Sequence, residues 1–145
     1  MLPDGNGGEV PVDADAIAYV VIPEAGPPAV RGEFTRLTGV AVGDFGVVIA
    51  RGRIVPVIVA DTGPFAKLGE GSLALHRALG RELCTERGAD GICRGMVEPM
   101  ESIEGNVTTV LFPGSARHDL TPSTIAKTVH DEGLRLWAQA AFRRP

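Results

Sequence analysis

Two runs of β-branched residues joined by a short linker constrain the fold of this chain more than any other feature. The runs are FGVVIA (45–50) and RIVPVIVA (53–60), and they flank the dipeptide Arg51-Gly52. Apolar runs of this composition, separated by two residues, predict a β-hairpin. Pro56 has no backbone N–H to donate, so we expect the second strand to lie at a sheet edge or to carry a bulge there. A chain built around such a hairpin is predicted to be rich in β-structure.

Three further strands are predicted from shorter apolar runs. They are AYVVIP (18–23), a segment within EFTRLTGVAV (33–42), and NVTTVLFPGS (106–115). Residues 1–16 are polar and rich in Gly and Asp, so we expect a loose lead-in before a single domain over residues 17–145. We expect the segment from residue 89 to residue 105 to be irregular.

Helical spacing of apolar residues predicts one internal helix and one C-terminal helix. The first covers 73–86, with Ser72 as its N-cap. The second covers 122–142 and follows Thr121-Pro122, an N-cap with proline at the first helical position. Two helices among short strands that do not alternate with them predict an α+β, mostly β fold, and a small β-barrel or sandwich rather than a doubly wound sheet.

The charge and hydropathy of the chain exclude several classes of protein. Its formal net charge of −4 argues against a nucleic-acid binder and suits a small molecule or a polycation. No apolar run approaches the roughly 20 residues of a membrane span, so we expect no membrane insertion. The start, MLPDGNGG, lacks the basic and apolar regions of a signal peptide. We therefore expect either that the protein stays inside the cell or that a leader has been removed.

The two cysteines, Cys84 and Cys93, leave two interpretations open. No second pair and no nearby histidines complete four ligands, so we predict no metal site. The cysteines are either reduced thiols in the core or a disulfide that closes the loop TERGADGI (85–92). A disulfide would indicate an oxidising compartment.

The stretch DTGPFAKLGEGS (61–72) carries two carboxyl groups where a plain turn needs only glycines. Desolvation at the end of an apolar strand would raise the pKa of Asp61. The positive end of the following helix would favour the ionised form of Glu70. Environments that separate the pKa values of two carboxyl groups suit acid–base chemistry. The same residues also suit a structural turn, because Asp before Thr-Gly bonds the backbone and Glu near a helix start interacts with the helix dipole.

Four blocks of the chain resemble glycoside hydrolase family 75, a family of chitosanases. The blocks are YVVIP, VGDFGVVI, VPVIVADTGPFAKLGEGSLALHRALG and VTTVLFPGS, which lie within residues 15–118. The resemblance implies that Asp61 and Glu70 are a catalytic pair that cleaves β-1,4 linkages between glucosamine units within a chitosan chain, with inversion of configuration. It also implies a secreted enzyme, and we expect a monomer that needs no cofactor.

The aspartate turn is also similar to turns of double-psi β-barrel proteins, which include membrane-bound lytic transglycosylases and the rare lipoproteins. In several of these proteins the aspartate is the catalytic acid. This similarity implies a double-psi-like barrel of about six strands, and it agrees with the environments of the two carboxyl groups in making Asp61 the acid and Glu70 the base. Glutamate has the higher intrinsic pKa, so the reverse order stays open. Peptidoglycan cleavage and a non-catalytic carbohydrate-binding domain remain as alternatives.

Chitosan carries protonated amines, so its binding subsites are expected to offer carboxylates, hydroxyls and an aromatic ring. The candidates for these subsites are Tyr19, Asp44, Thr62, Lys67 and Ser115. Each also has a structural interpretation: a core tyrosine, a hairpin or turn aspartate, a turn threonine, a solvated loop charge and a cap of the FPGS turn, in that order.

Overall fold

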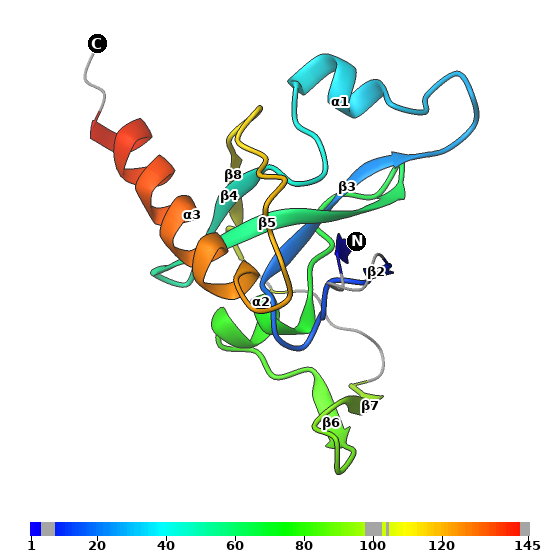
Figure 1. The fold of residues 1–145 in the computed structure, drawn as a ribbon, viewed down its shortest axis with the longest axis vertical. Coiled ribbons are helices and arrows are strands. Elements are labelled where there is room, and N and C mark those ends of the chain that lie inside the picture. Colours follow the sequence, from blue (N-terminus) through cyan, green and yellow to red (C-terminus); the bar gives the residue numbers. More distant parts are fainter. Residues whose placement is uncertain (4–7, 98–102, 104, 143–145) are drawn as a thin grey trace.

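A computed structural model describes residues 1–3, 8–97, 103 and 105–142, and within these ranges the chain forms strands and three helices around one main sheet (Figure 1). The elements in these ranges are β1 (Leu2–Pro3), β2 (Glu9–Val10), β3 (Tyr19–Ala25), α1 (Glu33–Thr38), β4 (Phe45–Ala50), β5 (Arg53–Pro64), α2 (Leu73–Ala78), β6 (Cys84–Arg87), β7 (Cys93–Met96), β8 (Thr108–Leu111) and α3 (Ile125–Phe142). The expected α+β, mostly β class is confirmed.

The main sheet has the strand order β3-β5-β4-β8 among the described residues. Strand β5 is parallel to β3 and antiparallel to β4, and β4 is antiparallel to β8. The sheet is curled like half of a barrel, and β1-β2 and β6-β7 form separate two-stranded sheets within the described ranges. A closed barrel of six strands is not seen in this part of the chain.

The predicted hairpin is confirmed as β4 and β5. Arg51 and Gly52 at its turn both have positive φ, 51° and 74°, which matches the twist of a two-residue hairpin connection. Pro56 lies in a central strand, but pairing with β3 begins only where Tyr19 meets Ile58. The N–H of Ile58 points toward β3. Residues two apart on a strand direct their N–H groups to the same side, so the side on which Pro56 lacks an N–H faces the region beyond the start of β3. The proline therefore costs the sheet no hydrogen bond.

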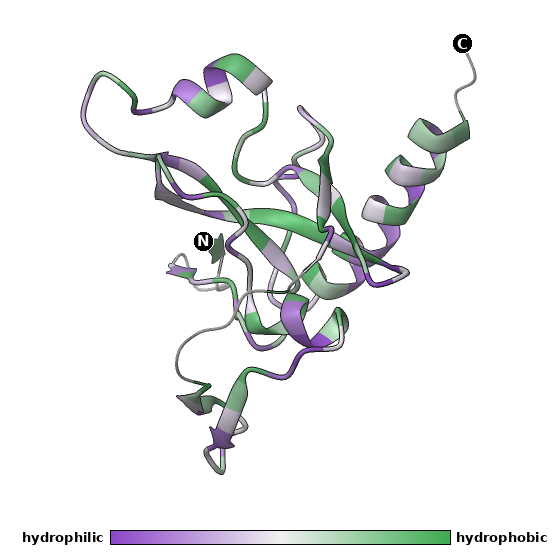
Figure 2. Cartoon of the chain, turned by 180° about the vertical axis from the view of Figure 1, so that it is seen from behind, coloured by the Kyte–Doolittle hydropathy of each residue, from purple (hydrophilic) through white to green (hydrophobic). Residues whose placement is uncertain are grey.

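The two faces of the main sheet carry separate hydrophobic clusters. The α2 face holds Val57 and Val59 of β5, packed with Leu75 and Leu79. The α3 face is defined by residues from β3, β4, β5, α3 and the N-terminal segment: Tyr19, Phe45, Ile58, Ala60, Ile125, Val129, Leu2 and Ile17. The central strands are mostly green, hence hydrophobic, in Figure 2.

Close packing of α3 on the sheet requires glycine at position 133. A Cβ added there would lie 2.8 Å from the Cβ of Pro56 and 2.9 Å from the carbonyl oxygen of Gly46. Helix α3 therefore crosses the hairpin at its Pro56 end, and the end of β5 near Asp61 lies outside this contact.

The expected strand within 33–42 is wrong, because the chain forms helix α1 there. Gly32 and Gly39 bound the helix, with φ of 74° and 75°, a conformation that glycine adopts most easily. The backbone N–H of Thr35 donates to Oε1 of Glu24 at 2.6 Å, which fixes the first turn to β3.

Helix α2 is shorter than expected, and α3 begins three residues later than expected. Ser72 does cap α2, since its Oγ accepts from the N–H of Leu75 at 3.1 Å. The helix ends at Ala78 because Gly80 has φ 86° and the N–H of Arg81 reaches back to the carbonyl oxygen of His76 at 2.9 Å. This is the pattern of a glycine-terminated helix, so the prediction that extended the helix to residue 86 was wrong.

The disulfide interpretation of the cysteines is confirmed. Cys84 and Cys93 are joined across the β6-β7 hairpin, with 5.8 Å between their Cα atoms, and the hairpin protrudes from the body of the molecule (Figure 1). Strand β7 lies within the segment 89–105 that was expected to be irregular. Residues 98–102 and 104 of that segment lie outside the described residues.

Part of the expected loose lead-in is packed. Strands β1 and β2 pair with each other, and Leu2 is buried against the α3 face. Within the described ranges, no helix combines the length and hydropathy needed to cross a membrane.

Candidate functional site

The stretch from Asp61 to Ser72 carries the chain from the end of β5 around to the outer edge of β3. The N–H of Val21 donates to the carbonyl oxygen of Glu70, and the N–H of Ser72 donates to that of Tyr19, each at 3.0 Å. Val20 and Gly71 form an isolated antiparallel bridge between these bonds. Strand β3 is therefore paired with β5 on one side and with residues 70–72 on the other.

Ser72 fixes the return of this stretch. Its Oγ accepts from the N–H groups of Tyr19 and Leu75 and donates to the carbonyl oxygen of Ile17 at 2.7 Å. The residue is 3% exposed, so water cannot replace these bonds. Gly69, with φ 88°, supplies the left-handed conformation that turns the chain back toward β3.

The return places Asp61 and Glu70 on either side of Val21. Asp61 is the register partner of Val21 in the parallel pair β3-β5, and Glu70 is opposite Val21 in the antiparallel bridge. Residues paired in this way point to the same face of a sheet. Two strand spacings of about 4.8 Å put the Cα atoms of Asp61 and Glu70 about 9–10 Å apart.

Gly63 gives independent support for this shared face. It lies two residues after Asp61 on the same strand, and so on the same face. A Cβ added to Gly63 would be 2.7 Å from Oε2 of Glu70. The carboxylate of Glu70 therefore lies over the strand that carries Asp61, against a position where only glycine leaves room.

Asp61 is exposed, and its Oδ1 accepts from the N–H of Thr62 at 2.8 Å. The expected desolvation of this carboxyl group is therefore not found: the apolar part of β5 ends at Ala60, and the side chain beyond it is open to water. The same openness lets a ligand reach the carboxyl group directly.

Tyr19 is half-buried, and its side chain lies on the α3 face, the same face as that of Asp61. Burial raises the pKa of its hydroxyl group, and the negative charges of Asp61 and Asp13 raise it further. The hydroxyl therefore keeps its proton at neutral pH and can donate a hydrogen bond. Asp13 belongs to the expected lead-in and was not predicted as a site residue, because only the fold brings it near Tyr19.

The partner of Glu70 is Lys67 rather than the start of α2. The Lys67 Nζ forms an ion pair with Oε1 of Glu70, and the two side chains are 57% and 31% exposed. A turn places the lysine, since its N–H donates to the carbonyl oxygen of Pro64 at 2.9 Å. The expected effect of the helix dipole on Glu70 is thus replaced by a direct contact with an ammonium group.

The other predicted subsite residues do not join this cluster. Thr62 pairs with Ile22, so its side chain points to the α2 face, opposite to Asp61. Asp44 is 1% exposed, and its two oxygens accept from the N–H groups of Ala41 and Ala116, each at 2.9 Å. A carboxylate buried in this way links two loops and cannot contact a polymer.

Ser115 also has structural bonds. Its Oγ accepts from the N–H of Phe45 at 2.8 Å and donates to the carbonyl oxygen of Phe112 at 2.6 Å. It caps the FPGS turn and fixes that turn to β4. The structure therefore brings together Tyr19, Asp61, Lys67 and Glu70 and leaves the others outside.

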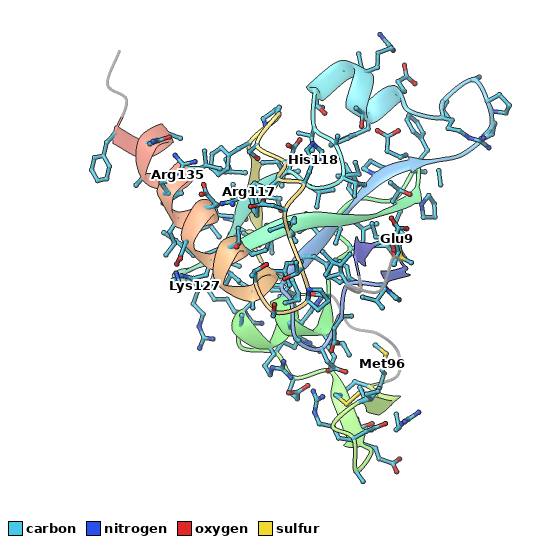
Figure 3. All side chains as sticks on the ribbon, viewed as in Figure 1. Glu9, Met96, Arg117, His118, Lys127 and Arg135 are labelled. Atoms are coloured by element: carbon cyan, nitrogen blue, oxygen red, sulfur yellow. A yellow bond between two sulfur atoms is a disulfide. The ribbon has the colours of Figure 1, made fainter. Side chains whose placement is uncertain are left out.

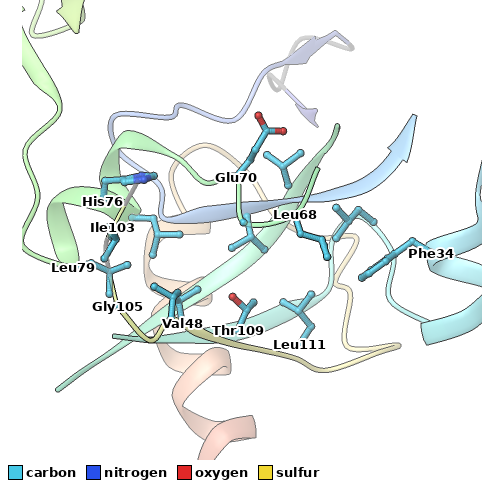
Figure 4. Close-up of a pocket in the computed structure, with 16 residues that line it drawn as sticks. Phe34, Val48, Leu68, Glu70, His76, Leu79, Ile103, Gly105, Thr109 and Leu111 are labelled. Carbon is cyan, nitrogen blue, oxygen red and sulfur yellow. The ribbon is translucent and has the colours of Figure 1, made fainter. Parts of the chain in front are cut away.

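A cavity lies mainly on the α2 face of the sheet. It has a volume of about 620 Å³, and its lining is mostly apolar, with Val48, Leu75 and Leu111 among its residues. In Figure 4 the carboxylate of Glu70 points away from these side chains. Val21 and Glu70 nevertheless line this cavity, so the open surface that carries Asp61 adjoins the cavity at Glu70.

Among the described residues, no group of three or more His, Cys, Asp or Glu side chains is placed to hold a metal ion. No protein-family model matches the sequence, and no curated protein matches it.

Proposed function

We propose that the protein is an endo-acting chitosanase that hydrolyses β-1,4 bonds between glucosamine units with inversion. The observation that carries the proposal is the position of Asp61 and Glu70 on either side of Val21, on one open face of the sheet. Inverting glycosidases separate their two carboxyl groups by about 6.5–9.5 Å so that a water molecule fits beside the sugar. Asp61 and Glu70 lie in one row across β5, β3 and the bridged segment 70–72, with their Cα atoms about 9–10 Å apart, a separation of the same order.

In the proposed reaction, Glu70 is the base and Asp61 is the acid. Glu70 takes a proton from a water molecule as the water oxygen attacks the anomeric carbon. Asp61 gives its proton to the glycosidic oxygen as the bond to the leaving sugar breaks. The exposure of the Glu70 side chain supports the role of base, because at 31% exposed it leaves room for a water molecule beside the carboxylate.

A cationic polysaccharide suits the charge around this site. Asp13 and Asp61 place carboxylates near Tyr19, the carboxylate of Glu70 lies beside Gly63 on the same face, and the whole chain has a net charge of −4. Protonated amines of glucosamine are attracted to such a surface. The protonated hydroxyl of Tyr19 would donate to a sugar oxygen, and its ring would contact the apolar side of a sugar.

The proposal extends to the architecture and the location of the protein. We infer that the curled sheet belongs to a double-psi-like barrel, an inference supported by the loop that leaves β5 and returns on the far edge of β3. We also infer a monomer that acts outside the cytoplasm. The Cys84–Cys93 disulfide supports this location, because such bonds persist in oxidising compartments.

Two isosteric substitutions test the proposal. We expect Asp61→Asn and Glu70→Gln each to lower kcat/KM for chitosan about 100- to 10,000-fold, the usual contribution of an acid or base group. Circular dichroism should show an unchanged fold. Asp131→Asn and Glu33→Gln, which remove carboxylates on α3 and α1, are the matched controls and should keep their activity.

Product analysis separates the alternatives. Wild-type protein is incubated with chitosan, chitin and peptidoglycan, and the released ends are followed by mass and by anomeric configuration. An α-anomer formed first from chitosan supports inversion. Near-native turnover in either carboxyl variant would rule out the pair, products from peptidoglycan alone would change the substrate, and no product from any of the three would indicate a binding domain.

A further inference from the structure

The ion pair between Lys67 and Glu70 occupies one oxygen of the proposed base. Oε1 of Glu70 binds the Lys67 Nζ, and Oε2 lies against Gly63, where an added Cβ would be only 2.7 Å away. A cation that arrives with a ligand can bind at Oε1 only after the lysine has moved. Oε2 is then left for the water molecule of the proposed reaction.

We propose that Lys67 is a specificity residue whose ammonium group holds the place of a protonated sugar amine on Glu70 and is displaced when a glucosamine unit binds. This inference rests on the proposed function, since it names the group of the substrate that the same site selects.

The geometry makes such an exchange easy. The turn that carries Lys67 is fixed by its backbone N–H bond to Pro64, so the side chain can leave Glu70 without movement of the loop. The side chain is 57% exposed, and an exposed ion pair contributes little to stability. A sugar ammonium replaces one cation by another, and the carboxylate of Glu70 does not lose its counter-charge.

The exchange also accounts for a preference between substrates. An N-acetylated unit is neutral and cannot take the place of the ammonium group, so it would have to separate Lys67 from Glu70 without compensation. A deacetylated unit does compensate. Lys67 therefore makes the site beside Glu70 prefer glucosamine units to N-acetylated units. Because the lysine competes with the sugar amine for Glu70, it also weakens the binding of glucosamine.

Removal of the competing charge tests the proposal. The protein is compared as Asp61→Asn, in which an oligomer of glucosamine is bound but not cleaved, with and without Lys67→Met. We expect the added Lys67→Met to tighten calorimetric binding of a glucosamine hexamer about two- to fivefold at low salt. The gain should shrink as salt is added, because salt screens exposed charges.

Two further variants serve as controls. Lys67→Arg keeps the cation and should bind like the parent. Lys127→Met removes a lysine paired with Asp131 on the exposed side of α3 (Figure 3) and should also leave the affinity unchanged.

The outcomes distinguish this proposal from the proposed function. Equal or weaker binding by the Lys67→Met variant overturns the role of Lys67, even if the wild-type protein hydrolyses chitosan. Absence of binding in every variant also overturns it. Tighter binding by Lys67→Met supports the role, and if the wild-type protein then releases no reducing ends, only the catalytic function fails.

Discussion

At the scale of single residues, Gly63 decides where the carboxylate of Glu70 can lie. A methyl group at this position would be 2.7 Å from Oε2 of Glu70 and 3.0 Å from Cγ1 of Val21. We predict that Gly63→Ala lowers kcat/KM for chitosan about 100-fold, because a displacement of about 1 Å in a catalytic group has an effect of this size. Steady-state kinetics with reducing-end detection measures the change.

The matched control is Thr62→Ala, one residue away on the same strand. Its side chain points to the α2 face, away from both carboxyl groups, and its removal should leave kcat/KM within about twofold. Full activity in Gly63→Ala would mean that Glu70 does not need its observed position.

The two carboxyl groups could be predicted from the sequence, but their relation could not. Asp61 and Glu70 stood out because a plain turn has no need of two acids. Val21, which aligns them, and Gly63, which makes room, gave no signal, since a valine in a strand and a glycine in a turn are common. Asp13 was missed for the same reason: its proximity to Tyr19 depends on how the N-terminal segment folds back.

At the scale of elements, the sequence correctly predicted the features that depend on residues adjacent in the chain. The turn Arg51-Gly52 and the Ser72 cap depend on residues next to them, and both were found. Helix α1 was missed because Phe34 and Thr35 favour strands, whereas the glycines at its two ends and a bond from Glu24 determine a helix. Strand β6 was missed because leucine spacing extended through Leu83, beyond the stop at Gly80.

The β6-β7 hairpin is expected to be stabilised largely by its disulfide. Its links to the rest of the chain include the bond from the Cys93 N–H to Asp15 and the ion pair between Arg87 and Asp15. A crosslink over such a short loop contributes about 2–3 kcal/mol. We predict that Cys84→Ser/Cys93→Ser speeds hydrogen exchange in residues 84–96 about 30- to 100-fold.

Mass spectrometry of peptides from β4 and β5 provides the internal control for this measurement. Their exchange should match that of the wild-type protein, because both strands are buried in the main sheet. Equal acceleration in β5 would show that the hairpin unfolds together with the core.

At the scale of the whole molecule, the position of α3 decides which part of the sheet stays open. The helix covers the Pro56 end of the α3 face through Gly133, and the Asp61 end lies beyond it. The parallel pairing of β3 with β5 joins residues far apart in the chain, so no local pattern indicates it. The sequence therefore predicted a β-rich class, and only the structure gives the order of strands and the open face.

Loss of one ion pair that joins distant segments should contribute to unfolding of the molecule in acid. The Arg87 guanidinium, 2.8 Å from Oδ1 of Asp15, and the Cys93 N–H together hold the pKa of Asp15 below its ordinary value of 3.8. A lowered pKa in the folded state means that the pair stabilises the fold above pH 3.8 and that this stabilisation is lost as the pH falls through the folded-state value. We predict that Asp15→Asn lowers the urea midpoint at pH 7. The difference from wild type should disappear toward about pH 2–3, below the ordinary pKa range of aspartate.

The control, Asp131→Asn, removes a pair within one turn of α3 and should change the midpoint less, because that pair joins no distant segments. A difference for Asp15→Asn that stays constant with pH would show that the hydrogen-bonding shape of the side chain, and not its charge, stabilises the fold.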